Sequence, residues 1–244
     1  IYPGIEKMCF SGSTVVEEDQ VVAFYPGIAA GQMVAISSDP LLLNWEKSGP
    51  LETGAGDADI WKEGDTYYGL TGGIERYQPD STGLPNQSQA FWPAWNLWSS
   101  KDLVNWESCG GLINQNTPFT DRYDDGACPN FQEIGDKHIL LFFSHRNGGQ
   151  YFLGDYYKKA HKFMPYDHGR FNHGRVAPGG VHAPSAASDD KGGVINILNI
   201  NNGKQSNEWD QIMSLPQRLS LGDDHALRIE PVESITKLRG EHRH

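Results

Sequence analysis

The chain contains one short segment twice, and this repetition limits the folds available to it. Residues 38–46 read SDPLLLNWE and residues 100–107 read SKDLVNWE, so that Trp45 and Trp106 are 61 positions apart. An acidic stretch, a strand-like run, a Gly-Asp turn and a second strand-like run follow each copy, and residues 151–199 form a weaker third round. Four-stranded units that recur about every 40–60 residues are typical of a β-propeller.

Short runs rich in β-branched and aromatic residues predict the strands of these units. The runs are residues 13–16, 21–25, 33–37, 60–62, 66–70, 97–99, 131–134, 138–144, 151–157 and 194–199. Gly64-Asp65 and Gly135-Asp136 each join two of them, as β-hairpin turns do. No window has the period of a convincing amphipathic helix, and 28 Gly and 14 Pro favour many turns. We therefore expect an all-β chain in which the Asn-Trp-Glu segments are packing corners of the blades.

Composition excludes several classes of protein. The 31 acidic and 20 basic side chains give a net charge of −11, which argues against a phosphate-binding surface and so against nucleic acid as a partner. No apolar run approaches the roughly 18–20 residues that a membrane-spanning helix needs, so the sequence predicts a soluble protein without a membrane partner. Three cysteines without CxxC spacing and nine histidines without HxxxH spacing predict no required metal and no cofactor. The compartment stays open, with a secreted or periplasmic one favoured.

Two aspartates are candidates for chemistry because each stands just before an apolar strand. Asp57 lies in GDADIW and Asp125 lies in DDGACPNF, 68 positions further on. In a propeller the first strand of each blade lines the central channel, so both carboxyl groups would face the axis. Carboxylates delivered there from successive blades can cleave a glycosidic bond, one as a proton donor and another as a stabilising or attacking group. The competing interpretation is that both are turn aspartates, since Asp is favoured in turns.

Six segments in order along the chain are similar to the motifs of one known family. CFSGS at residues 9–13 with AFYPG at 23–27 is similar to the family's "cFSGS … YTG", and VAISSD at 34–39 with WEK at 45–47 is similar to "A-x-S-x-D … W-x-K". GDADIW at 56–61 is similar to "R-D-P-x-V-W", and ACPNF at 127–131 is similar to "E-C-P-D-F". SLPQRL at 214–219 and EPV with LR at 230–239 are similar to the family's closing motifs. The family that these segments resemble is glycoside hydrolase family 32, the invertases, inulinases and levanases.

The resemblance implies a five-bladed propeller and a retaining mechanism, through a covalent fructosyl-enzyme, on β-fructofuranosides. It makes Asp57 the carboxylate that stabilises the transition state, although Gly56 and Ala58 replace the family's Arg and Pro. The family's nucleophile lies in "W-M-N-D-P-N-G", which does not occur in this sequence. We therefore expect an incomplete first blade, with the nucleophile on a removed or separate N-terminal segment of the same protein.

The family's acid/base Glu aligns with Ala127, which transfers no proton. One interpretation gives its role to Asp125, or to Asp124 if the backbone turns there. Another is that the protein binds sugar without cleaving it, and a third is a related propeller glycosidase acting on arabinofuranosides. The sequence-based candidates for substrate binding are Phe10, Ser11, Trp61 and His182.

The domain prediction is a single catalytic-type propeller over residues 1–244 without a C-terminal β-sandwich. Residues 74–93 interrupt the repeat and are predicted to form a loop at the rim of the site. The sequence-based conclusion is a hydrolase of β-fructofuranosidic bonds, in sucrose or fructans.

Overall fold

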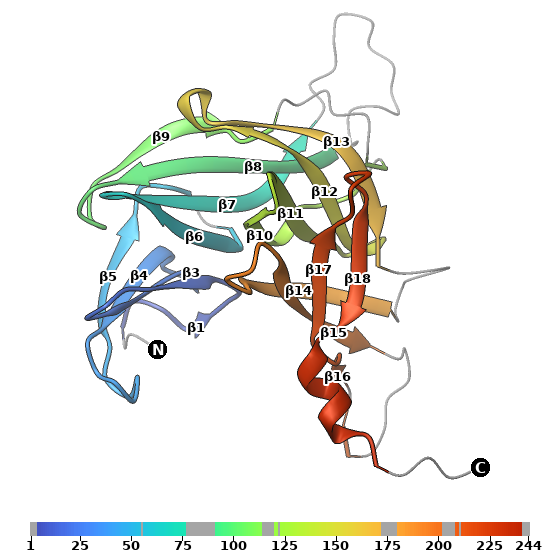
Figure 1. Ribbon diagram of the computed structural model, residues 1–244. Helices are drawn as coiled ribbons and strands as arrows, with labels where there is room; N and C mark the ends of the chain where they lie inside the picture. The colour runs from blue at the N-terminus through green and yellow to red at the C-terminus, as the bar shows by residue number, and fades with distance from the viewer. Residues whose placement is uncertain are drawn as a thin grey trace, which may run out of the picture.

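The computed structural model is all-β, as the sequence predicts, and its strands form four antiparallel sheets (Figure 1). It describes residues 4–54, 56–76, 91–113, 120–121, 123–171, 180–201, 208–209 and 211–240. The sheets follow one another along the chain as the blades of a propeller. The prediction of five blades with an incomplete first blade is wrong, because the described residues build four sheets and the first of them has five strands.

Each blade is a meander of neighbouring strands. The first contains β1 (Met8–Cys9), β2 (Ser13–Val16), β3 (Val21–Ile28), β4 (Gly31–Ser37) and β5 (Glu46–Leu51). The second contains β6 (Ala58–Glu63), β7 (Thr66–Arg76), β8 (Phe91–Ser100) and β9 (Trp106–Gly111). The third contains β10 (Ala127–Ile134), β11 (Lys137–Ser144), β12 (Gly148–Tyr157) and β13 (Lys162–Arg170). The fourth contains β14 (Gly180–Ser188), β15 (Val194–Asn201), β16 (Gln211–Met213), β17 (Gln217–Leu221) and β18 (Leu227–Pro231).

Helical structure in the described residues is limited to two short 3-10 segments, η1 (Lys158–Ala160) and η2 (Glu233–Leu238). Neither they nor any other described segment form a helix of the length and apolarity that crossing a membrane requires. All ten sequence-predicted runs lie within strands. The two predicted hairpin turns are also confirmed: Gly64 and Gly135 have φ of +57° and +58°, a left-handed conformation that favours glycine.

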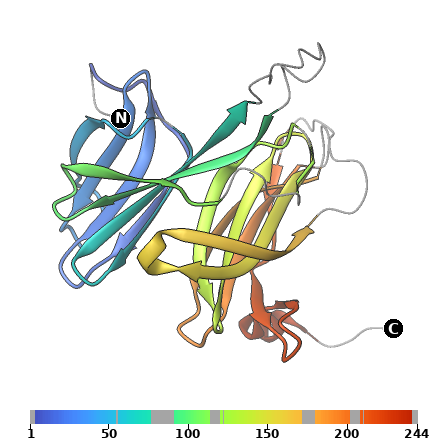
Figure 2. The same cartoon turned by 90° about the horizontal axis from the view of Figure 1, so that it is seen from above.

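The first strands of the blades stand next to one another. β6 contacts β2 on one side and β10 on the other, and β10 in turn contacts β14. Figure 2 shows the first blade (blue) at one side of the molecule and the third and fourth blades (yellow-green to orange) at the other, with strands of the second (teal to green) between them. Residues that immediately precede β2, β6 and β10 are therefore brought together from three different blades.

Apolar side chains fill the spaces between successive blades. Val22 and Phe24 of the first blade form one cluster with Ile60 and Tyr67 of the second. Equivalent clusters join the second blade to the third and the third to the fourth. Each sheet therefore buries its faces against its neighbours, which is how a propeller makes its core.

The repeated Asn-Trp-Glu segments form the same corner twice, as predicted. Asp39 accepts hydrogen bonds from the backbone amides of Leu41, Leu43 and Asn44, and the indole N–H of Trp45 donates to the carbonyl of Leu42 at 2.8 Å. In the second copy Asp102 accepts from Val104 and Asn105, and the indole of Trp106 donates to Leu103. These donors lower the pKa of both aspartates. The repeat is thus structural.

Candidate active site

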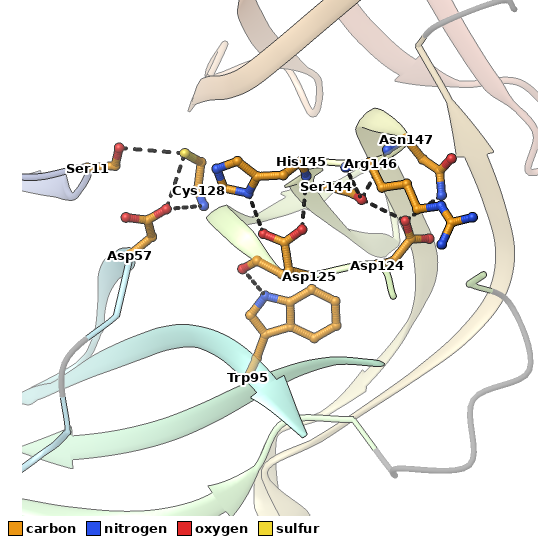
Figure 3. Close-up of polar contacts among 11 residues, drawn as sticks. Ser11, Asp57, Trp95, Asp124, Asp125, Cys128, Ser144, His145, Arg146 and Asn147 are labelled. Atoms are coloured by element: carbon orange, nitrogen blue, oxygen red, sulfur yellow. Dashed lines mark hydrogen bonds and ion pairs between the residues drawn. The ribbon is translucent and has the colours of Figure 1, made fainter. Parts of the chain in front are cut away.

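Three segments converge where the inner strands of the first three blades begin. Ser11 precedes β2, Asp57 directly precedes β6, and Asp125 stands two residues before β10. The amide of Ala58 donates to the carbonyl of Ser11 at 3.2 Å, which fixes the start of the second blade against the first. We take this group, with the residues that contact it, as the candidate active site (Figure 3).

Asp57 is held by the third blade. Its Oδ2 accepts a 3.0 Å hydrogen bond from the backbone amide of Cys128 and lies 3.5 Å from the Sγ of the same residue. Cys128 can point its amide this way because it has φ +48° and lies in a bulge between Ala127 and Asn130, where the β10–β11 register shifts. The Sγ of Cys128 also lies 3.5 Å from the Oγ of Ser11. Blades one, two and three therefore meet at one thiol.

The thiol of Cys128 remains protonated at neutral pH. Burial, and after it the negative charge of Asp57, raise its pKa to about 12. A protonated thiol donates to a carboxylate and is a poor nucleophile. Cys128 therefore positions Asp57 and does not attack a substrate.

Asp125 forms a pair with His145, which follows β11. Its Oδ1 accepts the backbone amide of His145 at 2.9 Å, and its Oδ2 lies 2.6 Å from the Nδ1 of the imidazole. The carboxyl group is mostly buried, whereas the His145 side chain is 75% exposed. The pairing follows from the register of β10 on β11, in which Ala127 lies opposite Phe143. Two residues before Ala127 and two residues after Phe143, the chain places Asp125 opposite His145.

Asp124, the alternative acid in the sequence analysis, belongs to a different network. It is fully buried and accepts 2.6 Å hydrogen bonds from the Oγ of Ser144 and the Nδ2 of Asn147. Its Oδ2 accepts the amide of Asp121 at 3.1 Å. These bonds fasten the turn between β11 and β12, and so hold the chain segment that carries His145.

His182 on β14 reaches the same region from the fourth blade. Its ring lies 4.8 Å from that of Phe143, which in turn lies 4.7 Å from the ring of His145. Burial lowers the pKa of His182, and its electrostatic interaction with His145 lowers it further. The structure therefore brings Ser11, Asp57, Asp125 and His182 together.

The other two predicted substrate-binding residues are Trp61, which packs against the core, and Phe10, which is exposed and adjacent to Ser11. Trp61 packs within the blades, 5.6 Å from the ring of Tyr68 and 5.4 Å from that of Phe131. Phe10 has a side chain that is 54% exposed, and its amide donates to the carbonyl of Pro26. The predicted rim loop, residues 74–93, lies mostly outside the described residues.

Sequence reasoning missed two members of the site, His145 and Cys128. The Gly135-Asp136 turn could have revealed His145. In an antiparallel hairpin with this turn, residues at equal distances before and after the turn face each other, which puts residue 145 near residue 125. Within the described part of the chain, no three His, Cys, Asp or Glu side chains gather as metal ligands would. The absence of a required metal stays a prediction.

Comparison with known families decides the relationship. The family model described as "Glycosyl hydrolases family 32 N-terminal domain" matches residues 86–231, which is more than half of the chain. The chain belongs to glycoside hydrolase family 32. The resemblance inferred from six short motifs is thereby confirmed.

Solved structures of this family share the fold. A Bombyx mori family 32 β-fructofuranosidase has a TM-score of 0.74 and 22% identity over 99% of this chain and 54% of its own. A mutant of that enzyme was solved in complex with sucrose. A sucrose-6-phosphate hydrolase from Lactobacillus gasseri has a TM-score of 0.69 and 20% identity over 95% of this chain and 50% of its own.

This family 32 chain therefore spans about half the length of the structures it matches first. A search among curated proteins finds no match. A β-xylosidase/α-arabinofuranosidase of family 43, from a compost microbial metagenome, has a TM-score of 0.61 and 14% identity over 94% of this chain and 75% of its own. The propeller is thus common to two glycosidase families.

Proposed function

We propose that this family 32 chain is a catalytic propeller that hydrolyses β-fructofuranosidic bonds, in sucrose or fructans, with retention of configuration. The observation that carries the proposal is the position of Asp57. Its carboxylate stands at the start of the second inner strand and is fixed by the amide of Cys128 from the third blade. A fixed carboxylate there can bind sugar hydroxyls and stabilise the oxocarbenium-like transition state.

The proton that leaves with the alcohol would come from the group around Asp125. Ala127 takes the place of the family's acid/base Glu, and Asp125 with His145 is the titratable pair beside it. The remaining substrate contacts would come from Ser11 and Phe10 in the first blade and His182 in the fourth. Trp61 would support the site from within the blade rather than touch the sugar.

The nucleophile would come from a separate segment, because the family's nucleophile motif does not occur in these 244 residues. We propose an N-terminal piece of the same protein as that partner and a β-fructofuranoside as substrate. The printed descriptions of the similar structures, a β-fructofuranosidase and a sucrose-6-phosphate hydrolase, support this substrate class. We also propose that residues 1–244 form a single propeller domain.

The test is hydrolysis of sucrose, inulin, levan and an arabinofuranoside by the protein as purified, with the intact mass of every polypeptide present. Release of fructose from any of the first three supports the proposal. Cleavage of the arabinofuranoside alone would make it an arabinofuranosidase. Fructose binding by calorimetry without any turnover would replace hydrolysis with carbohydrate binding.

A further inference from the structure

His145 has one ring nitrogen engaged and the other directed away from its partner. The Nδ1 lies 2.6 Å from the Oδ2 of Asp125, and the backbone amide of His145 occupies the Oδ1 of the same carboxyl group. A carboxylate in this position accepts the Nδ1–H and fixes the orientation of the ring. The Nε2 is then the atom left for a second partner.

The same contacts make Asp125 a poor proton donor. Both of its oxygens accept hydrogen bonds from one residue, and its side chain is 20% exposed, against 75% for the imidazole it holds. A group that must protonate a leaving oxygen needs an accessible proton. In this pair only the imidazole meets that requirement.

The surroundings of His145 place it at the candidate site. Its ring packs 4.7 Å from Phe143, whose other neighbour is His182 at 4.8 Å. Figure 3 shows the imidazole beside the carboxyl group of Asp125, on the side toward Cys128 and Asp57. The buried Asp124 network with Ser144 and Asn147 holds the turn that carries the ring.

We propose that His145 is the general acid and base of this protein, and that Asp125 is its positioning residue. This inference rests on the proposed function, and it assigns to an imidazole the role that a Glu at position 127 would have had. It differs from the sequence-based hypothesis, in which Asp125 itself gives the proton.

The reaction has two steps, cleavage of the glycosidic bond and then hydrolysis, and water is the co-reactant. The proton on Nε2 passes to the glycosidic oxygen, which takes the electron pair of its breaking bond to the anomeric carbon and leaves as an alcohol. As that bond breaks, the carboxylate of the proposed N-terminal segment bonds to the anomeric carbon, and it stays bonded to that carbon until the second step. A water oxygen then bonds that carbon and displaces the carboxylate, while one proton of the water returns to Nε2.

The experiment compares two substrates that differ in their need for an acid. Methyl β-fructofuranoside releases an alcohol that must be protonated, whereas 4-nitrophenyl β-fructofuranoside releases a phenolate that need not be. We expect His145→Gln to lower kcat/KM for the methyl glycoside by about 10²–10⁴-fold and for the nitrophenyl glycoside by less than about tenfold. Asp125→Asn should shift the ratio of the two rates in the same direction by a smaller factor.

A second exposed His–Asp pair provides the matched control. The Nε2 of His225, between β17 and β18, lies 3.7 Å from the Oδ1 of Asp136, and its side chain is 54% exposed. His225→Gln should leave both rates unchanged. The inference is overturned if His145→Gln behaves as His225→Gln does, or if it lowers both rates equally. Failure of the wild-type protein to cleave either glycoside would overturn the proposed function, and this inference with it.

Discussion

The carboxyl group of Asp59 in the second blade accepts a 2.6 Å hydrogen bond from the backbone amide of Phe131 in the third blade. The Oγ of Ser13 in the first blade donates to the other oxygen of the same carboxyl group at 2.5 Å. Asp59 is 1% exposed. One buried side chain therefore joins three blades two residues after Asp57, and it is distinct from the groups that we assign to chemistry.

Burial of Asp59 should make the free energy of unfolding depend on pH. Desolvation raises its pKa from 3.8 to about 6, although the bonds from Phe131 and Ser13 favour the charged form. A raised pKa in the folded state gives stability that is present below pH 4 and is lost as the pH rises toward 6. The loss amounts to about 3 kcal/mol at 1.36 kcal/mol for each pKa unit.

This prediction is measured with Asp59→Asn, which cannot ionise. Urea unfolding of wild type and variant at several pH values between 4 and 7 gives the difference in stability at each pH. The difference should move in favour of the variant by about 2–3 kcal/mol over this range. Asp65→Asn, an exposed substitution in the same blade, should show no such trend. A wild-type-to-variant difference independent of pH would contradict the raised pKa.

Replacement of Asp57 by Asn should abolish most of the proposed hydrolytic activity and leave the fold intact. The amide oxygen of Asn can still accept from the amide of Cys128, but it carries no charge to stabilise the transition state. We expect a loss of about 10²–10³-fold in kcat/KM for fructose release from sucrose. Asp65→Asn again serves as the control. Full activity of the Asp57 variant would remove this carboxylate from the mechanism.

In the first three blades the sequence predicted the inner strands better than the outer ones, whereas in the fourth blade it predicted β15 but not the inner strand β14. Strands such as β11 and β15 are apolar and buried, so the alternating or continuous apolar runs identify them. The outer strands β5 and β9 have the sequences EKSGPL and WESCGG, and their residues are largely half-buried or exposed. Their positions depend on pairing with a neighbour rather than on local pattern, which is why the sequence did not reveal them.

The sequence predicted a residue of the candidate site only where the local sequence around that residue was enough to identify it. Asp57 could be found because it precedes an apolar strand and matches a family motif. The pairing of Asp125 with His145 requires the register of β10 on β11, and the contact of Asp57 with Cys128 requires a bulge and a positive φ. The number of blades was mistaken because the value of five came from the resemblance, whereas the described residues build four sheets.

The second copy of the repeated corner should matter more for stability than the first. Trp106 stacks on Phe24 of the neighbouring blade with ring centroids 5.0 Å apart, and it packs against the apolar cluster between the first two blades. Trp45 packs against a small cluster within its own blade. We expect Trp106→Ala to cost about 3–5 kcal/mol in urea unfolding and Trp45→Ala to cost less. Trp106→Phe should recover part of the loss, and equal costs at both corners would contradict the inter-blade role.

Alkylation should separate Cys128 from Cys9 in the native protein. Cys9 is exposed, whereas burial and then the charge of Asp57 raise the pKa of Cys128 to about 12. Only the thiolate reacts, so iodoacetamide at pH 7.5 should modify Cys9 and leave Cys128 unmodified when peptides are read by mass spectrometry. Both should react in about 6 M guanidinium chloride, because the denaturant unfolds the chain and exposes both thiols.

Because burial is the larger cause, Cys128 should stay protected in Asp57→Asn as well. Rapid modification of Cys128 in that variant would mean that the carboxylate, and not the packing of three blades around the thiol, keeps it protonated. Rapid modification in the wild type would contradict the geometry of the site, since a thiolate beside Asp57 would repel the carboxylate that it is meant to hold. The reactivity of one thiol thus reports on the contact that fixes the proposed stabilising carboxylate.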